Sequence, residues 1–235
     1  MKKYPGQKKI YGVYHKIINE IPAHSNYYEL FAGSAQIAQL LLAASPGGTV
    51  NFVLNDLSTA VTDTYNFNCR EQVRYAGITV KNNKAIDIIQ SELAAALTNH
   101  FVFMDPPYIH SSRPTNTKLY DFEMTDADHL QLLNAVLQLN CYCMIIHPKC
   151  DLYDKMLAGW RKVQIKIRYN RKTSIECLYM NYPPPSTLQT DKYLGDNCWD
   201  RQRIKRKSDR LIKKITELPE LERKYLMSRL QQATI

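Results

Sequence analysis

Segments with helical periodicity alternate along most of this chain with short apolar runs that are typical of buried strands. Strands are predicted at 27–30, 51–54, 77–81, 101–104 and 141–146, and helices at 8–20, 35–44, 58–74, 87–98, 126–139 and 151–158. This alternation favours an α/β layer fold with a mostly parallel sheet. Two further segments, 163–170 and 174–181, predict an antiparallel pair that closes the sheet.

The character of the chain changes after Pro183-Pro184-Pro185. Two charged segments with helical periodicity follow, at 200–216 and 219–232. We therefore expect one domain over residues 1–185 and a basic helical extension over 186–235. A solvated pair of charged helices and a phosphate-binding tail are equally open interpretations of this extension.

The 235 residues carry a net charge of +9, which favours a polyanionic partner. No stretch approaches the roughly 20 apolar residues of a membrane span, so we expect no membrane partner. The N-terminal residues lack the apolar core of a signal peptide. The six cysteines match no zinc spacing and are expected to be reduced, so a cytoplasmic protein is the simplest inference.

The apolar run 101–104 ends in Asp105-Pro106-Pro107-Tyr108. Each proline lacks an N–H and restrains the preceding residue to extended geometry, so this loop is stiff. The Asp105 carboxylate and the Pro106 carbonyl are acceptors that suit the two hydrogens of an amino group on a planar base, and the Tyr108 ring can stack on that base. For the four residues alone, an ordinary turn after a strand is the alternative.

Two other polar segments follow predicted strands. Glu29 lies near the end of the strand 27–30, before a turn at Gly33, where a ligand can approach the backbone because no side chain blocks it. Asp56 follows the next strand, where an acid can hold the hydroxyl groups of a ribose, although it could equally cap the helix that starts near Ser58. Ligands of open parallel sheets bind at the carboxyl ends of strands near the topological switch point. Together with the Asp105 loop, these segments predict a binding site there.

At these positions the chain resembles the DNA adenine-N6 methyltransferases of the D12 class, which are relatives of the Dam methylase and include small phage and prophage members. The resemblance covers most of the chain. It rests on Tyr4-Pro5-Gly6-Gln7-Lys8, Tyr28-Glu29-Leu30-Phe31-Ala32-Gly33-Ser34-Ala35, Asn55-Asp56, Ala85-Ile86-Asp87-Ile88, Asp105-Pro106-Pro107-Tyr108, Glu123-Met124-Thr125-Asp126 and Tyr179-Met180-Asn181-Tyr182. It implies a Rossmann-like, seven-stranded methyltransferase sheet.

The resemblance further implies S-adenosylmethionine as methyl donor and adenine in DNA as acceptor, with the target base flipped out of the duplex. The implied catalytic residues are Asp105, Pro106, Pro107 and Tyr108. The implied donor-binding residues are Tyr4, Gly6, Lys8, Glu29, Phe31, Ala32, Gly33, Ser34, Asp56, Leu57 and Asp87. In this scheme Asp56 binds the ribose, Asp87 lies near the donor adenine and Lys8 meets the donor carboxylate. Positioning and fixed acceptors supply the rate enhancement without a metal ion.

The chain departs from the family pattern at two places. Gln7 stands where many relatives have a second glycine, and His147-Pro148 stands where small relatives often have Gly-Tyr or a polar pair. No role for His147 follows from the sequence. A histidine at a strand end is more often held by local hydrogen bonds than catalytic.

The segment between Asp87 and Asp105 holds one predicted helix and one predicted strand, so it has no room for the target-recognition domain of Dam-like enzymes. Three explanations remain open. The loop 109–121 could read a short site, the basic extension could contact DNA, or a partner protein could bring specificity. The candidate DNA-binding residues are Ser112, Arg113, Lys118, Arg201, Arg203 and Lys205.

Three other functions compete with DNA methylation. Adenine in RNA suits the same loop and the same basic charge. A non-catalytic, donor-binding DNA accessory protein is disfavoured because all four loop residues are intact. Methylation of protein glutamine is disfavoured because its loop normally begins with asparagine rather than with the acid Asp105.

Overall fold

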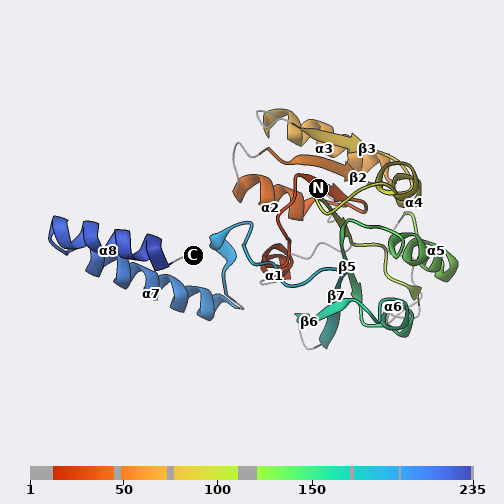
Figure 1. Cartoon of the computed structure of the whole chain (residues 1–235). Helices are drawn as coiled ribbons and strands as arrows, with labels where there is room; N and C mark the ends of the chain where they lie inside the picture. Colours follow the sequence, from red (N-terminus) through yellow and green to blue (C-terminus); the bar gives the residue numbers. More distant parts are fainter. Residues whose placement is uncertain are drawn as a thin grey trace. The chain divides into compact units, whose positions relative to one another are not determined.

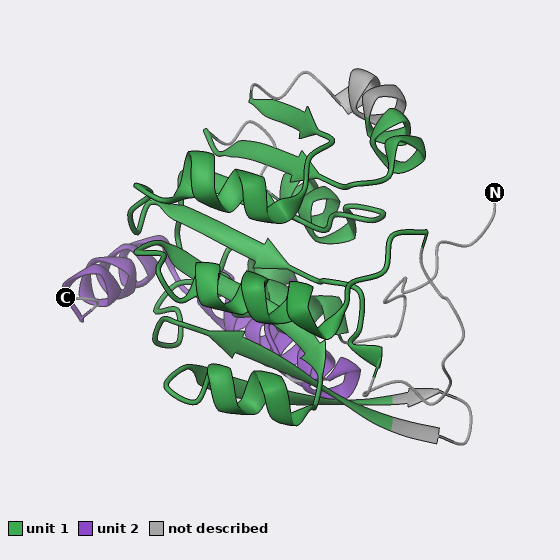
Figure 2. Ribbon diagram, turned by 90° about the vertical axis from the view of Figure 1, so that its right-hand side faces the viewer, with its two compact units in different colours: residues 1–192 green, residues 193–235 purple. Residues whose placement is uncertain are grey.

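The structure is a computed structural model that describes residues 13–44, 49–72, 77–110, 121–169, 172–195 and 197–233. For residues 66–72, 168, 169, 172 and 173 it describes the backbone alone. The chain divides into two compact units, Met1–Lys192 and Tyr193–Ile235, which Figure 2 shows in separate colours. The Gln189 amide donates to the Pro22 carbonyl at 2.7 Å, so the first unit continues beyond the boundary at residue 185 that the sequence favours.

The first unit is built on one sheet with the strand order β3-β2-β1-β4-β5-β7-β6. Its strands are β1 (Asn26–Glu29), β2 (Asn51–Asn55), β3 (Ile78–Lys81), β4 (His100–Met104), β5 (Tyr142–Pro148), β6 (Arg161–Tyr169) and β7 (Lys172–Met180). The pairs from β3 to β5 are parallel, whereas β7 runs antiparallel to both β5 and β6. This arrangement confirms the expected seven-stranded, Rossmann-like sheet with an antiparallel closing strand.

Helices lie on both faces of the sheet, with α1 and α2 on one side and α4, α5 and α6 on the other (Figure 1). The helices of this unit are α1 (Val13–Asn19), α2 (Gln36–Ala44), α3 (Thr59–Gln72), α4 (Ala85–Ile88), the π-helix η1 (Ile89–Leu93), α5 (Asp126–Val136), α6 (Asp151–Met156) and the 3₁₀-helix η3 (Asp191–Tyr193). Because helices cover both faces, the central strands are buried on both sides, which explains why β4 and β5 are continuous apolar runs in the sequence.

Two predicted helices differ from the observed ones in extent. The helix expected over 87–98 begins at Ala85, changes to π-helical geometry at Ile89 and ends at Leu93. The helix expected over 126–139 ends at Val136. Its start is fixed by a capping box, in which the Thr125 hydroxyl accepts from the Asp128 N–H at 3.2 Å and the Asp128 carboxylate accepts from the Thr125 N–H at 2.8 Å.

The second unit contains the helices α7 (Cys198–Thr216) and α8 (Glu220–Ala233), which confirms the two helical segments expected in the basic extension. The Asn197 side chain caps α7 by accepting from the Asp200 N–H at 2.9 Å. Neither helix has a buried side chain. Among the described residues, no helix is long and apolar enough to cross a membrane.

Candidate functional site

The carboxyl ends of β2, β1 and β4 lie side by side in the sheet. The registers pair Glu29 of β1 with Leu54 of β2 and with Phe103 of β4, so the three strands end at nearly the same level. The chain continues from β1 to β2 on one side, while β4 lies on the other, which makes this the topological switch point. Asp56 and Asp105 follow directly after their strands. The fold thus brings the three predicted segments to one place.

Glu29 is an acid buried beneath this site, with 3% of its surface exposed. Its Oε2 accepts from the Tyr27 hydroxyl at 3.0 Å and from the Ala38 N–H of α2 at 3.2 Å. Burial, together with the nearby carboxylates of Asp105 and Asp56, raises the pKa of Glu29 to about 8 against the lowering effect of the two hydrogen bonds. Asp105 and Asp56 thus lie close enough to affect the pKa of Glu29, and a cationic ligand bound here would favour its ionised form.

Asp56 holds the turns after β1 and β2 in place. Its Oδ2 accepts from the Gly33 N–H and its Oδ1 from the Ser58 N–H, both at 2.9 Å. Burial raises the pKa of Asp56, and these two hydrogen bonds oppose that rise. The contact with Ser58 fits the capping alternative for Asp56. Each carboxylate oxygen still has a second lone pair, so capping does not exclude the binding of a ribose hydroxyl.

The turn after β1 has unusual backbone geometry. Gly33 has a φ of 50° and Ala35 a φ of 48°, both in the left-handed region that favours glycine. The Gly33 carbonyl accepts from the hydroxyl of Tyr65 on α3, a contact that the sequence did not predict. This turn is therefore held from α3 as well as from Asp56.

The other predicted donor-binding residues of these turns are spread between the core and the surface. Ala32 is buried and its N–H donates to the Asn55 carbonyl at 2.9 Å. Phe31 and Ser34 are half-buried, whereas Leu57 is exposed.

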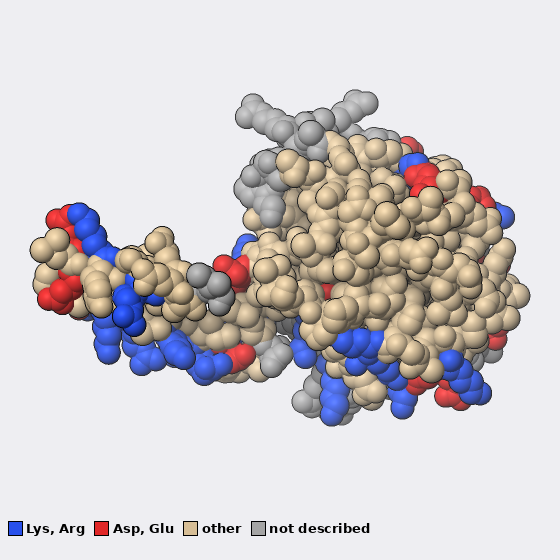
Figure 3. All heavy atoms as spheres, viewed as in Figure 1, with Lys and Arg blue, Asp and Glu red and all other residues tan. Residues whose placement is uncertain are grey.

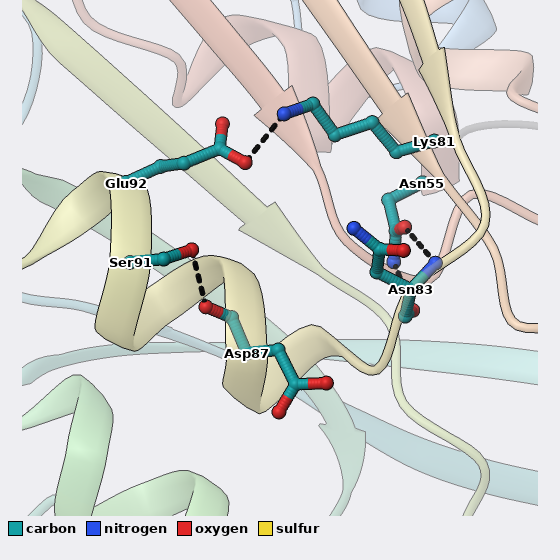
Figure 4. Close-up of polar contacts among 6 residues, drawn as sticks. All are labelled: Asn55, Lys81, Asn83, Asp87, Ser91 and Glu92. Atoms are coloured by element: carbon teal, nitrogen blue, oxygen red, sulfur yellow. Dashed lines mark hydrogen bonds and ion pairs between the residues drawn. The ribbon is translucent and has the colours of Figure 1, made fainter.

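Asn55, which is fully buried, connects the ends of three strands. Its amide nitrogen donates to the Leu30 carbonyl at 3.0 Å. The same nitrogen donates to the Asn83 carbonyl and its Oδ1 accepts from the Asn83 N–H, both at 3.0 Å (Figure 4). Asp87 lies in the first turn of α4, where its own carbonyl accepts from the Ser91 hydroxyl at 2.6 Å. Figure 4 shows the exposed Asp87 side chain pointing away from the ion pair between Lys81 and Glu92.

The Asp105 loop is fixed at its far end by two residues of the antiparallel edge. The Tyr108 hydroxyl donates to Glu176 Oε1 of β7 at 2.6 Å, and the Ile109 N–H donates to His147 Nε2 of β5 at 3.1 Å. Glu176 and His147 are both buried. The two residues are close in the sheet, because His147 of β5 pairs with Cys177 of β7, the residue after Glu176.

His147 is held in one neutral tautomer. Because Nε2 accepts from Ile109, the proton lies on Nδ1, which donates to the Pro148 carbonyl at 2.8 Å. The imidazole stacks on the Tyr153 ring of α6, with centroids 4.1 Å apart and an interplanar angle of 6°. Its edge meets Tyr108 at 5.7 Å and 71°. The local hydrogen bonding expected for His147 is therefore observed, together with a contact to the loop that the sequence did not predict.

Several predicted residues cannot be placed at this site. Tyr4, Gly6 and Lys8, and the loop residues Ser112, Arg113 and Lys118, lie outside the described residues. Arg201, Arg203 and Lys205 belong to the second unit. Glu176 was missed because a single acid in an alternating strand gives no sign of its long-range partner.

No protein-family model matches the chain, and no curated protein matches it. Its backbone is similar to precorrin-6y C5,15-methyltransferase from Geobacter metallireducens, with 11% identity over 77% of this chain and 91% of that one and a TM-score of 0.49. It is also similar to TrmK from M. capricolum in complex with S-adenosyl-homocysteine, with 7% identity over 94% of this chain and 95% of that one and a TM-score of 0.48. A conserved hypothetical protein from Streptococcus pyogenes gives 17% identity, 74% and 96% coverage and a TM-score of 0.48. Identities and scores this low carry no argument about activity.

Proposed function

We propose that this protein transfers a methyl group from S-adenosylmethionine to the N6 amino group of adenine in DNA. The observation that carries the proposal is the position of Asp105, which follows β4 directly beside the end of β1 at the switch point of the sheet. A rigid acceptor for an amino group is thus adjacent to the buried acids Glu29 and Asp56. The family resemblance of the Asp105-Pro106-Pro107-Tyr108 segment supports the same assignment.

The residues at the ends of β1 and β2 fit this donor. The donor carries positive charge, which suits the acid Asp56 and would favour ionisation of the buried Glu29 beside it. The left-handed turn at Gly33 lets a ligand approach the backbone, since no side chain projects there. Asp56 would hold the ribose, and the exposed Asp87 would lie toward the adenine end of the donor. When bound, S-adenosylmethionine supplies the electrophilic methyl group.

The Asp105 loop would prepare the amino group of the target base. The lone pair of an adenine amino group is delocalised into the ring, which makes the nitrogen a poor nucleophile. Hydrogen bonds from both amino hydrogens to the Asp105 carboxylate and the Pro106 carbonyl favour a more tetrahedral nitrogen. The loop would need no rearrangement for this task, because Glu176 and His147 hold its far end.

A pair of variants tests the proposal. We expect Asp105→Ala to abolish transfer of labelled methyl from the donor to adenine-containing DNA while leaving donor binding nearly unchanged. Asp87→Ala serves as the matched control, because it removes an acid of the donor side. We expect it to weaken donor affinity and to recover transfer at saturating donor. Normal turnover by Asp105→Ala would refute the assignment.

Matched DNA and RNA strands distinguish the two nucleic-acid substrates. The chemistry of the loop serves an adenine amino group in either polymer, so the same labelled donor should be offered with both. Transfer to DNA with adenine replaced by 2-aminopurine, which lacks the N6 amino group, should be absent. Labelling of RNA but not of DNA would replace DNA by RNA in the proposal and leave the roles of Asp105 and Pro106 unchanged.

A further inference from the structure

Helix α7 carries most of its cations on one face. At 3.6 residues per turn, these cations and one tryptophan fall within an arc of about 120° around the helix axis, and no acid lies in this arc. We call it the basic face. The basic face consists of Trp199, Arg203, Arg206, Lys207, Arg210, Lys213 and Lys214. The acids of α7, Asp200 and Asp209, lie just outside this arc.

Part of the surface of α7 outside the basic face is apolar. Ile204, Leu211 and Ile215 follow one another at spacings of seven and four residues, which places them on one stripe turned away from the basic face. Ile204 and Ile215 are half-buried, whereas every cation of the basic face is exposed. Figure 3 shows the Lys and Arg side chains gathered along this helix. The half-buried apolar side chains of α7 thus lie on a different part of its surface from the exposed cations.

Charge segregation of this kind does not stabilise the helix. Cations three and four residues apart, such as Arg206 and Arg210, repel each other. Among the described residues, the basic face forms ion pairs at Arg203 with Asp200, at 2.6 Å, and at Lys213 with Glu217, at 3.7 Å. A solvated helix supported by its own salt bridges would instead alternate the signs of its charges. The arrangement fits a polyanion better than it fits internal pairing.

Trp199 identifies the kind of polyanion. Its indole is 77% exposed at the N-terminal end of the basic face. An exposed aromatic ring beside a track of cations is the combination by which proteins bind single-stranded nucleic acids, because bases stack on the ring while cations contact phosphates. We propose that the basic face of α7 holds the backbone of a nucleic-acid strand and that Trp199 stacks on one of its unpaired bases.

This inference deepens the proposed function by placing nucleic-acid contacts on the extension. It rests on the proposed function only where it takes the bound strand to be the substrate. It also revises the residues expected there. Arg203 belongs to the basic face, but Arg201 and Lys205 lie on the other side of α7. Arg201 is half-buried and donates to the Gly195 carbonyl at 3.4 Å. We expect neither Arg201 nor Lys205 to contact phosphate.

Two double variants test the sidedness of α7. R210Q/K214Q and R201Q/K205Q each remove one Arg and one Lys four residues apart, the first pair from the basic face and the second from outside it. Binding of a fluorescent, unstructured oligonucleotide would be measured at several salt concentrations without methyl donor. We expect R210Q/K214Q to lower the slope of log affinity against log salt by about 1.4, or about 0.7 per lost phosphate contact. Between about 50 and 200 mM salt, the wild type then loses roughly sevenfold more affinity than this variant. R201Q/K205Q should keep the wild-type slope.

The role of Trp199 is tested by W199A and W199F. W199A should weaken binding to the single strand by about fivefold or more, whereas W199F keeps an aromatic ring and should retain most of the affinity. Equal slopes for the two double variants would overturn the inference. So would binding of anionic phosphatidylserine vesicles, but not oligonucleotide, through the same cations. Because no donor is present, failure of methyl transfer would refute the proposed function while leaving this result unaffected.

Discussion

Replacing Glu29 with glutamine should stabilise the protein at neutral and alkaline pH. The pKa of Glu29 rises from 4.5 to about 8, first because the group is buried and then because Asp105 and Asp56 lie nearby. Between these two values the folded protein keeps a proton that the unfolded chain releases. The stability that Glu29 contributes is therefore complete below pH 4.5 and is lost as the pH rises toward 8. Over the whole interval the loss amounts to roughly 5 kcal/mol.

Urea unfolding at pH 6, 7, 8 and 9 measures this effect. The free energy of unfolding of Glu29→Gln minus that of the wild type should grow by about 1.4 kcal/mol per pH unit up to pH 8 and then level off. Other buried acids, such as Asp56, are common to both proteins and cancel in the difference. Glu222→Gln, at an exposed position of α8, controls for the general loss of one negative charge. A difference that stays constant from pH 6 to pH 9 would refute the reasoning.

The same substitution should weaken donor binding. A cation bound beside Glu29 favours the ionised form of this residue. Glu29 should therefore release its proton when the donor binds near neutral pH. We expect donor affinity for the wild type to rise as the pH rises toward 8 and this rise to be smaller in Glu29→Gln. Calorimetry in buffers of different ionisation enthalpy would count the released protons. Equal donor affinity and equal proton release in both proteins would mean that Glu29 serves stability alone.

The contacts behind the Asp105 loop and the cap of α5 give three further predictions. His147→Phe keeps a ring against Tyr153 but removes the acceptor for the Ile109 N–H. We expect it to lower the free energy of unfolding in urea by about 1–3 kcal/mol and to slow methyl transfer. His147→Gln retains an acceptor and should recover part of the stability and part of the transfer rate. Tyr108→Phe should lower kcat without changing donor affinity, because it breaks the bond to Glu176 that holds the ring; an unchanged kcat would leave that bond without a part in transfer. Thr125→Ala should cost about 1 kcal/mol of stability with unchanged kcat.

The positions of the segments that follow the strands, such as Asp105, were predictable because they depend on local sequence patterns. An apolar run such as 101–104 identifies a strand that is buried on both faces. The polar residues after it then lie at the carboxyl ends of the parallel strands. The mostly parallel α/β sheet was predicted from the alternation of helices and strands, whereas the order of its strands was not. The cap of α5 also depends on a local pattern, because Thr125 precedes the helix and the acid Asp128 follows three residues later.

The support behind the loop was not predictable, because it depends on contacts across long stretches of sequence. Tyr108 and Glu176 are 68 positions apart, and Ile109 and His147 are 38 apart. Their contacts exist because β7 inserts antiparallel between β5 and β6, which sets the register that aligns His147 with Cys177. A one-residue slip of β7 would turn Glu176 to the other face of the sheet. The register comes from packing of the whole strand, which no single residue reveals.

The electrostatics of the two units impose a division of labour on the proposed reaction. The strand-end site carries Asp56 and Asp105 near the buried Glu29, which keeps its proton near neutral pH, so the site favours a cationic donor and disfavours phosphate. We expect cations elsewhere to hold a polyanionic substrate, and the basic face of α7 carries such cations. R210Q/K214Q should therefore raise KM for the nucleic acid while leaving kcat at saturation and donor affinity unchanged. A fall in kcat with unchanged KM would contradict this division, because it would mean that the cations act on the chemical step.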